Sequence, residues 1–414
     1  MHWPFQKKNA YDCTYILHLN VDCIKGICAI KVLLSVLNKN IHREVMSKKF
    51  VLISPKNRTA YNFRGNLIKD IIAQGYEVVV TGPNCIDIDK IEVLGAKFVE
   101  IPMNKNGVNP ITDLKYILAL KRLLKYEKAD ATLGYTIKPV IYGAIAAKMA
   151  GVKNITSMVT GVGYLFISTS LKARLLKSVS VILYKIGMAC AHRVIFQNGD
   201  DRKEFIEHGL VKENKTYLVN GSGVDMNHFL PLPMPKRVTF LMLSRALYSK
   251  GVVEYLEACK MLKEKYPDVR CMLLGAVENM QDSLSMDELQ PYINGGIIDY
   301  YDETSDVRRY VEQCSVYVLP SYREGTPRTV LEAMAMKRPI ITTNAPGCRE
   351  TVVDGRNGFL VPVKNSRVLA DKMEYFILHP ENIEVMGEES LRYCRTKFEI
   401  KKVNNSMLNI MKLI

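Results

Sequence analysis

From residue 50 onward, short apolar runs alternate with longer stretches in which apolar residues recur at helical spacing. The runs FVLIS, EVVVTG and KFVEIP are each followed by such a stretch, for example DLKYILALKRLLKYEKA after the third run. This alternation is typical of βαβ units, in which parallel strands form a sheet covered by helices on both faces. We therefore expect an α/β fold.

A proline-rich joint, LPLPMPK at residues 230–236, interrupts the alternation, which then starts again with VTFLMLS. Such a joint predicts a domain boundary, and a length of 414 residues suits two domains. We expect two doubly wound domains that face each other and bind ligands at the carboxyl ends of their strands. The expected limits are 46–229, 237–390, and a helix at 391–414 that crosses back to the first domain.

The first 45 residues differ from this pattern. Residues 16–37 are fairly apolar, but charged residues interrupt them, so no run of about 18 apolar residues remains to cross a bilayer. MSKKFVLISP, from Met46, has a polar start followed at once by a first core strand. We interpret residues 1–45 as an extension from a mis-assigned start; an interfacial anchor is the alternative.

Composition narrows the class of protein. The chain is 48% hydrophobic and 24% charged, which is typical of a folded globular protein. Its ten cysteines form no CxxC pair and have no companion histidine spacing, so a zinc site and a disulfide framework are both disfavoured. We expect mostly buried, reduced thiols in a cytoplasmic protein.

The net charge of +15 is unevenly distributed. Residues 46–225 contain 26 Lys or Arg and 15 Asp or Glu, a balance of +11, whereas residues 226–414 contain 25 and 24, a balance of +1. Residues 131–199 contain eight Lys or Arg and no acidic residue. Such a surface would attract phosphates of a lipid, a nucleic acid or a small substrate, although buried elements could also lack acids by chance.

Two cations follow the first strand of the second half. Arg245 and Lys250 lie in SRALYSKG, between a predicted strand and a predicted helix. The N-terminus of a helix favours an anion because its amides are free and its dipole is positive there. The pattern therefore implies a phosphate or diphosphate ligand; two solvated loop cations are the alternative.

The stretch SYREGTPRTVLEAMAMKRP contains two separated glutamates. We expect Thr326 to cap a helix that begins at Pro327, with Glu324 in the preceding loop and Glu332 inside the helix. At about 1.5 Å per residue, the two carboxylates do not form an adjacent pair. Glu324 is suited to accept hydrogen bonds from sugar hydroxyls and Glu332 to hold a second diol, while the amides of Gly325 and Thr326 could meet phosphate oxygens.

Ordinary structural roles are the alternative for both glutamates. Glu324 could be an exposed loop acid and Glu332 a common helix residue. The neighbours of Glu332 are apolar, however, and indicate a buried helix in which a lone acid needs a partner.

The stretch REGTPRTVLEAMAMKRPIITTNAPGCRETVVDGRNGFLVP resembles the retaining, nucleotide-sugar-dependent glycosyltransferases of family 4, which have the GT-B fold of two facing Rossmann-like domains. The signature of that family, two glutamates separated by seven residues, matches Glu324 and Glu332. Its diphosphate loop matches Arg245 and Lys250. The resemblance covers about residues 46–400, and a later motif matches Gly347, Glu350, Asp354, Gly355, Asn357 and Gly358.

The resemblance implies the transfer of a hexose or N-acetylhexosamine from a UDP-sugar to a lipid-linked or polysaccharide acceptor in cell-surface glycan biosynthesis. Glu324, Arg245 and Lys250 would be catalytic: the two cations would neutralise the leaving diphosphate, and Glu324 would hold donor-sugar hydroxyls. Glu332 would bind the ribose diol. Because the cations stabilise the developing charge, the resemblance implies neither a metal ion nor a cofactor.

The first half resembles the family less closely. RTAYNFRGNLIKD is similar to its first strand-loop-helix, where a loop including Arg64 and Gly65 would approach the acceptor or the diphosphate. TSMVTGVGYLF, residues 156–166, is similar to the TGxG passage of members that build bacterial glycans on polyprenyl-diphosphate carriers. Many other members have a donor-contacting histidine at the end of this strand, where Thr160 and Gly161 stand here. We count Arg64, Gly65 and Gly161 among the expected donor-binding residues.

The implied partners are a nucleotide-sugar, a glycan or polyprenyl-diphosphate-linked acceptor, and the inner face of the cell membrane. Lys172, Arg174, Lys177 and Lys185 lie among Leu and Ile and would suit an anionic membrane surface; an amphipathic core helix is the alternative.

Three other functions compete with sugar transfer. A nucleotide-sugar epimerase shares the fold but is not expected to have the spacing of the two glutamates, and a non-catalytic partner subunit remains open. Nucleic-acid binding is disfavoured, because the second half is neutral and the chain has no array of aromatic and basic residues.

Overall fold

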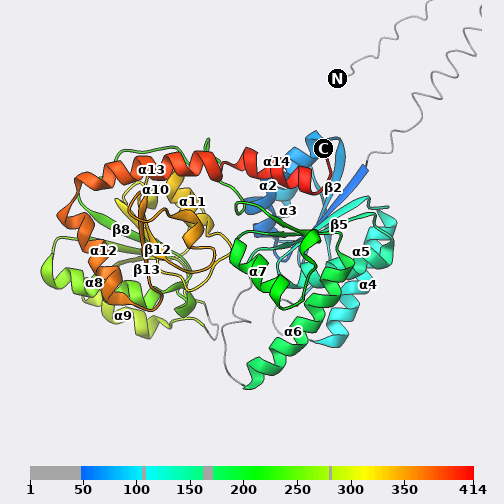
Figure 1. The fold of residues 1–414 in the computed structure, drawn as a ribbon, viewed down its shortest axis with the longest axis horizontal. Helices are drawn as coiled ribbons and strands as arrows, with labels where there is room; N and C mark the ends of the chain where they lie inside the picture. The colour runs from blue at the N-terminus through cyan, green and yellow to red at the C-terminus, as the bar shows by residue number, and fades with distance from the viewer. Residues whose placement is uncertain (1–47, 105–108, 162–170, 279–281) are drawn as a thin grey trace, which may run out of the picture. The chain divides into compact units, whose positions relative to one another are not determined.

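The computed structural model describes residues 48–104, 109–161, 171–278 and 282–414, of which Lys48–Ile414 form one compact unit (Figure 1). The extension predicted for residues 1–45, the start at Met46 and residues 162–166 of the TSMVTGVGYLF stretch lie outside the described residues.

Seven parallel strands form the first sheet, in the order β3-β2-β1-β4-β5-β6-β7. They are β1 (Lys48–Ile53), β2 (Tyr76–Gly82), β3 (Lys97–Glu100), β4 (Ala131–Tyr135), β5 (Asn154–Val159), β6 (Arg193–Phe196) and β7 (Thr216–Leu218). The helices between them are α2 (Asn57–Ala73), α3 (Ile88–Glu92), α4 (Pro110–Tyr126), η1 (Pro139–Gly143), α5 (Ala144–Ala150), α6 (Leu171–Cys190), α7 (Gly199–Glu207) and η3 (Glu213–Lys215).

The central strand β1 is buried on both faces because its side chains alternate between two cores. Phe50 and Leu52 pack with residues of α2, whereas Val51 and Ile53 pack with residues of α4 and α5. A parallel strand covered on both sides needs a continuous apolar run, as the FVLIS stretch provides.

Six parallel strands form the second sheet, in the order β10-β9-β8-β11-β12-β13. They are β8 (Thr239–Leu243), β9 (Arg270–Leu274), β10 (Asp299–Tyr301), β11 (Val316–Leu319), β12 (Ile340–Thr343) and β13 (Gly358–Val361). The helices that follow β8 are η4 (Tyr248–Lys250), α8 (Val252–Lys265), α9 (Met286–Asn294), α10 (Arg308–Val311), α11 (Arg328–Ala335), η5 (Arg349–Thr351), α12 (Ser366–Leu378), α13 (Glu381–Lys397) and α14 (Ile400–Ile410).

Both sheets have the strand order of a Rossmann-like fold, which confirms the predicted fold class. In each, the chain builds one side of the sheet and then continues on the other side of its first strand. The change of direction falls between β1 and β4 in the first sheet and between β8 and β11 in the second. At such a switch point the loops diverge and leave room for a ligand beyond the carboxyl ends of the strands.

The proline-rich joint is fastened to the second sheet by Arg338, which is fully buried. Its guanidinium donates hydrogen bonds to the carbonyl oxygens of Leu232 at 2.9 Å and Pro233 at 3.1 Å, and also to that of Val311 at 3.1 Å. These bonds satisfy the charged group inside the protein and fix the path of the joint.

The last helix, α14, packs on the first sheet. Met407, Leu408, Met411 and Leu413 belong to the core that contains Phe50, and α14 lies beside α2 (Figure 1). The end of the chain therefore contributes to the hydrophobic core of the first sheet.

Candidate active site

Arg245 and Lys250 lie at the carboxyl edge of the second sheet. Arg245 follows β8, and Lys250 ends η4, separated from α8 by Gly251. Arg245 Nη1 lies 2.9 Å from Glu278 Oε2, and Lys250 Nζ lies 2.5 Å from Glu324 Oε1. Each of the two predicted cations therefore has a carboxylate partner at this edge.

Glu324 lies in the loop after β11, the strand next to β8, so it approaches Lys250 across the switch point. Its amide donates to the carbonyl of Pro346 at 3.0 Å. Gly347, with φ of 76°, makes this approach feasible, because a Cβ there would lie 2.2 Å from the Glu324 carbonyl oxygen. The loop is thus held from the β12 side by backbone contacts that only glycine permits.

Glu332 is 8% exposed and lies in α11, one turn after Arg328. Arg328 Nε donates to Glu332 Oε1 at 2.9 Å. Burial raises the pKa of Glu332, and the charge of Arg328 offsets only part of this effect. Arg328 also donates to the carbonyl of Asn62 at 2.5 Å and covers the ring of Phe63, 5.1 Å from its centroid. Glu332, the acid that was expected to need a partner, is therefore paired with Arg328. Arg328 in turn contacts α2, a helix of the first sheet.

The predicted start of α11 is wrong by one residue. The helix begins at Arg328, and Pro327 precedes it with an extended ψ of 111°. The hydroxyl of Thr326, expected to cap the helix, instead donates to the carbonyl oxygen of Gln197 at 3.0 Å, at the end of β6. A tertiary hydrogen bond has replaced the local cap that the sequence favours.

The predicted loop position of Arg64 and Gly65 is also wrong, because both lie inside α2, which already begins at Asn57. Gly65 faces the core, where a Cβ would lie 3.5 Å from a methyl carbon of Leu94.

Arg64 lies near the switch point of the first sheet, beside the last residue of β4. It is 2% exposed, and its guanidinium lies 5.2 Å from the ring centroid of Tyr135, the last residue of β4. Its Nη1 donates to Ser222 Oγ at 3.1 Å, while Nε has no hydrogen-bond partner among the described residues. Burial lowers the pKa of Arg64 to about 10. A buried guanidinium with an unused donor could still bind an oxygen of a ligand.

Gly161 and Gly325 come together at the ends of β5 and β11. Gly161 has a φ of 125°, and a Cβ on it would lie 3.1 Å from the Gly325 nitrogen. A Cβ on Gly325 would lie 2.1 Å from the Thr160 carbonyl oxygen. Both predicted glycines therefore permit the loops of the two sheets to touch.

Sequence reasoning missed Asn198, whose Nδ2 donates to the carbonyl oxygens of Glu324 at 3.2 Å and Gly325 at 2.9 Å. Its Oδ1 accepts from the amide of Asp201 at 2.7 Å and caps α7. An asparagine followed three residues later by an acid is a sequence signal for a helix cap. It carries no information about the second contact.

Arg245 lines a cavity of about 150 Å³ at the carboxyl ends of β8 and β9. Its other polar lining residues are Ser244, Glu278, Glu303 and Thr304. None of its described lining residues belongs to the Glu324 loop. In the described part of the chain, no group of three or more His, Cys, Asp and Glu could hold a metal ion.

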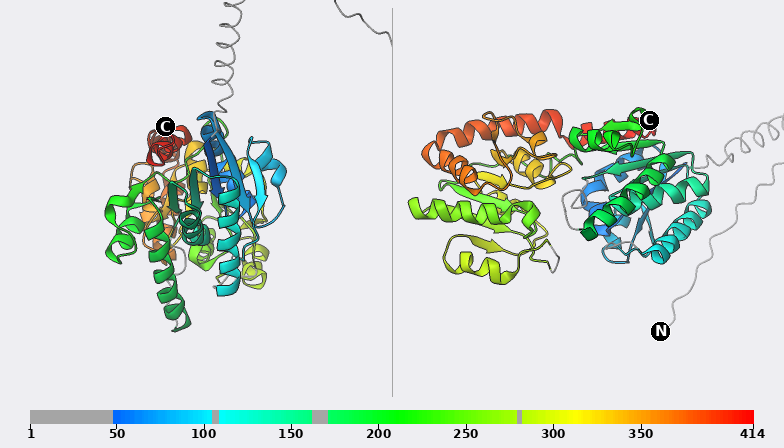
Figure 2. Two further views of the ribbon diagram at one scale, coloured as in Figure 1. Left: turned by 90° about the vertical axis from the view of Figure 1, so that its right-hand side faces the viewer. Right: turned by 60° about the horizontal axis from the view of Figure 1, so that its bottom comes forward.

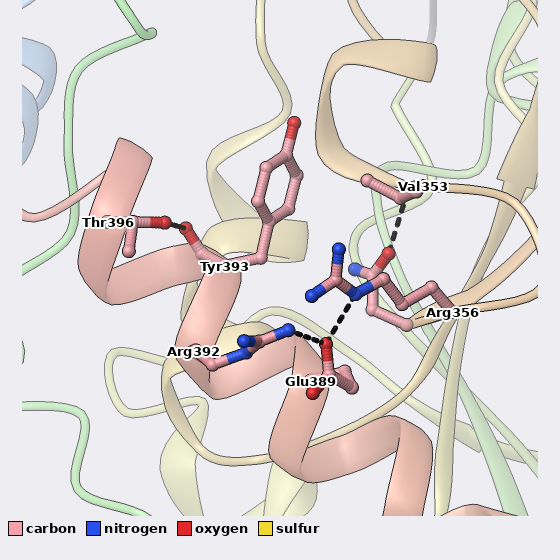
Figure 3. Close-up of a pocket in the computed structure, with 7 residues that line it drawn as sticks. Val353, Arg356, Glu389, Arg392, Tyr393 and Thr396 are labelled. Atoms are coloured by element: carbon pink, nitrogen blue, oxygen red, sulfur yellow. Dashed lines mark hydrogen bonds and ion pairs between the residues drawn. The ribbon is translucent and has the colours of Figure 1, made fainter.

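Another cavity, of about 250 Å³, lies between the turn before β13 and helix α13 (Figure 3). Its lining residues are Val353, Arg356, Asn357, Glu389, Arg392, Tyr393 and Thr396. Arg356 and Arg392 share the carboxylate of Glu389. Because Arg356 precedes β13, this cavity belongs to the amino edge of the sheet and not to the edge with Glu324.

Comparison with known proteins gives the class of this chain. The family model for glycosyl transferase 4-like proteins matches residues 51–198, and the model for glycosyl transferases group 1 matches residues 228–392. A crystal structure of HepE from Anabaena with UDP and glucose has the same fold, with a TM-score of 0.73 at 17% identity over 89% of this chain and 100% of that one. The fold and these matches define a GT-B glycosyltransferase.

Two curated relatives narrow the class to a family. The N,N'-diacetylbacillosaminyl-diphospho-undecaprenol alpha-1,3-N-acetylgalactosaminyltransferase of Campylobacter jejuni is 30% identical over 360 residues, 82% of this chain and 93% of the relative. The UDP-Gal:alpha-D-GlcNAc-diphosphoundecaprenol alpha-1,3-galactosyltransferase of Escherichia coli is 26% identical over 279 residues, 64% of this chain and 70% of the relative. The chain belongs to glycosyltransferase family 4, which confirms the identification made from its motifs.

Proposed function

We propose that this glycosyltransferase moves a hexose or N-acetylhexosamine from a UDP-sugar to a polyprenyl-diphosphate-linked glycan, with retention of the anomeric configuration. The contact of Lys250 with Glu324 at the switch point is the observation that carries the proposal. The names of both curated relatives specify a diphospho-undecaprenol-linked acceptor, and one specifies a UDP-sugar donor, which supports these substrate classes.

In the proposed reaction, the bond between the anomeric carbon and the diphosphate breaks, the oxygen of an acceptor hydroxyl bonds to the same carbon, and the hydroxyl proton passes to the leaving diphosphate. Negative charge develops on the leaving diphosphate. Arg245 and Lys250 are the cations proposed to stabilise it, and a preorganised cation acts more strongly there than one in bulk water. Glu324, beside Lys250, is proposed to accept hydrogen bonds from the sugar hydroxyls, and Glu332 from the ribose diol.

The main test compares Lys250→Ala and Glu324→Gln with the wild type. Removing one charge-stabilising group from an active site costs about 100- to 1000-fold in kcat, so we expect losses of that order in sugar transfer. Donor hydrolysis is first screened across UDP-, GDP- and ADP-sugars, and transfer is then measured with short polyprenyl-diphosphate glycans. Proton NMR of the product reports whether its anomeric configuration is retained.

Lys265→Ala is the matched control, because Lys265 also ends a helical turn and pairs with a carboxylate, at 3.2 Å from Glu374, but on the surface. Its activity should stay within about twofold of the wild type, since exposed ion pairs contribute little. Full turnover in a folded Lys250→Ala or Glu324→Gln protein would refute the proposed site.

We also propose that transfer needs no metal ion, because Arg245 and Lys250 are proposed to neutralise the leaving diphosphate themselves. Activity should be unchanged after the enzyme is treated with EDTA and desalted. Loss of transfer that Mg²⁺ or Mn²⁺ restores would contradict this proposal.

Peripheral association with an anionic membrane is the final part of the proposal. In α6, Val179, Ile182 and Ile186 are exposed, and their spacing brings them to one face of the helix together with Lys185. The N-terminal end of α6, which contains three further Lys or Arg and no acid, extends beyond the neighbouring elements (Figures 1 and 2). No helix among the described residues is long and apolar enough to span a bilayer.

An exposed apolar face with basic residues suits the interface of an anionic bilayer. Ile182→Glu should weaken co-sedimentation with phosphatidylglycerol vesicles and leave the weak binding to phosphatidylcholine vesicles unchanged. Val93→Glu, at another exposed apolar position directly after α3, is the control and should bind as the wild type does. Equal binding by Ile182→Glu and the wild type would exclude α6 as the membrane contact.

A further inference from the structure

Arg323 precedes Glu324 in the loop after β11 of the second sheet. Its side chain contacts α7, a helix that belongs to the first sheet. Its Nε and Nη2 lie 3.1 Å and 2.5 Å from the same carboxylate oxygen of Asp201, and Nη2 also contacts the carboxylate of Glu204. The side chains of Arg323 and Asp201 are 14% and 1% exposed. This is a largely buried ion pair between residues 122 positions apart.

Asp201 is itself held in one position. Its second carboxylate oxygen accepts from Asn198 Nδ2 at 3.0 Å, and its amide donates to Asn198 Oδ1 at 2.7 Å. Burial raises the pKa of Asp201, and Arg323 offsets part of this shift. Arg323 loses solvation as well, yet its bonds to Asp201 and Glu204 outweigh this effect and raise its pKa. Arg323 therefore binds a fixed acceptor at the start of α7.

Gly325 and Thr326, which follow Glu324, are hydrogen-bonded to the turn between β6 and α7. Asn198 binds the carbonyl oxygens of Glu324 and Gly325, and the hydroxyl of Thr326 binds the carbonyl of Gln197. The backbone of the loop is thus anchored to the β6–α7 turn, while the carboxylate of Glu324 remains directed to Lys250 on its own sheet.

We propose that Arg323 is a positioning residue, which holds the loop of Glu324 against α7 through Asp201 and Glu204 and so fixes the geometry in which Glu324 meets the donor. This inference rests on the proposed function, because it assigns Glu324 to the sugar. A guanidinium is needed rather than a simple cation, since its planar fork can contact both carboxylates at once.

The test measures kcat, the affinity for UDP and the folded fraction in Arg323→Gln and Arg323→Lys. A displacement of about 1 Å in an active site can cost about 100-fold, so Arg323→Gln should lower kcat by about 10- to 100-fold per folded molecule. Because Glu324 is assigned to the sugar and not to the nucleotide, the affinity for UDP alone should stay within about twofold. Arg323→Lys, which keeps the charge and loses the fork, should recover part of the lost kcat.

Arg356→Gln is the matched control, since Arg356 also pairs with a carboxylate, 2.6 Å from Glu389, at the amino edge of the same sheet (Figure 3). It should have the kcat of the wild type. If Arg323→Gln does not fold, Glu204→Gln replaces it, because Glu204 is the more exposed partner at 23% and its loss leaves Asp201 paired. The expected fall in kcat is then smaller, about 3- to 10-fold.

A purely structural role would lower the melting temperature and leave kcat per folded molecule unchanged, and that result would overturn the inference. So would an equal loss of UDP affinity in Arg323→Gln. Glu324→Gln distinguishes failure of the proposed function from failure of the positioning role. If Glu324→Gln keeps full kcat, the proposed function fails. If Glu324→Gln loses kcat and Arg323→Gln does not, only the positioning role of Arg323 fails.

Discussion

At the scale of single residues, the two glutamates of the signature form ion pairs with different kinds of partner. Glu324 pairs with Lys250 across the switch point, whereas Glu332 is buried in α11 and pairs with Arg328 one turn before it. Arg328 is anchored in turn to the carbonyl of Asn62. The pair of Arg328 and Glu332 therefore links the proposed ribose site to the first sheet.

The raised pKa of Glu332 predicts a dependence of stability on pH. Because its pKa in the folded chain lies above the ordinary value of 4.5, the native state keeps a proton that the unfolded chain has released. The contribution of Glu332 to the free energy of unfolding therefore falls as the pH rises from about 4.5 through the raised pKa. Glutamine does not titrate, so Glu332→Gln does not lose stability in this way. The melting temperature of the variant, relative to that of the wild type, should therefore rise between about pH 4 and pH 7.

Thermal unfolding followed by circular dichroism at both pH values gives this difference. Glu207→Gln is the control, because Glu207 is also a helical acid four residues after its basic partner, Lys203, but is exposed. The difference between this control and the wild type should not change with pH. A constant difference for Glu332→Gln would mean that Glu332 is ionised equally in both states.

At the scale of elements, glycines decide how closely the loops at the carboxyl edge approach one another. Gly161 and Gly325 permit contact between the turns after β5 and β11, and Gly347 permits the segment after β12 to reach the carbonyl of Glu324. The loop of Glu324 is therefore enclosed by backbone on two sides. A methyl group on Gly325 or Gly347 would displace it, because its carbon would lie 2.1 Å or 2.2 Å from a carbonyl oxygen.

Gly347 and Gly355 form a matched pair for testing this enclosure. Their φ angles are 76° and 74°, but a Cβ on Gly347 would lie 2.2 Å from the Glu324 carbonyl oxygen, while one on Gly355 would meet no atom within 4 Å. Both alanine variants should lose about 1–2 kcal/mol to backbone strain. Only Gly347→Ala should also lower kcat, by about 10-fold or more, since it must shift the Glu324 loop.

Chemical denaturation and steady-state transfer rates, measured on both variants, separate strain from displacement. Equal rates in Gly347→Ala and Gly355→Ala would show that the close approach at Gly347 does not control the position of Glu324.

At the scale of the whole molecule, the two sheets depend on each other through the end of the chain. The second sheet is followed by α12 and α13. Then α14 supplies Met407 and Leu408 to the core that contains Phe50 of β1, and Met411, directly after α14, joins them. Asn404 Nδ2 adds a hydrogen bond to Asp70 of α2 at 2.6 Å. The core of the first sheet is thus completed by residues that follow the second sheet in the sequence.

Leu408→Ala should therefore destabilise the first sheet, although Leu408 lies at the other end of the sequence. Removing a buried leucine side chain costs about 2–5 kcal/mol, whereas Ser406→Ala, at an exposed position of the same helix, should change stability by less than about 0.5 kcal/mol. Urea unfolding followed by circular dichroism measures both. Equal stability of the two variants would mean that α14 is not part of the core of the first sheet.

Much of the fold and part of the site could be predicted because both depend on patterns formed by residues close together in the sequence. Apolar runs alternating with helical periodicity defined the α/β class, and the spacing of Glu324 and Glu332, with Arg245 and Lys250, indicated the family. The helix cap at Thr326 was predicted wrongly because its hydroxyl binds a distant partner, Gln197, that local propensity does not include. The loop around Arg64 was expected from the family resemblance, whereas α2 already begins at Asn57.

The sequence by itself determined the two series of strands and helices and the residue types that the proposed diphosphate and sugar sites require. Only the tertiary structure decided which of these residues meet. Lys250 reaches Glu324 because β8 and β11 are neighbours in the sheet, and Arg323 reaches Asp201 because their loops share one edge. Periodicity is fixed by residues a few positions apart, whereas strand order and buried ion pairs depend on the packing of the whole chain.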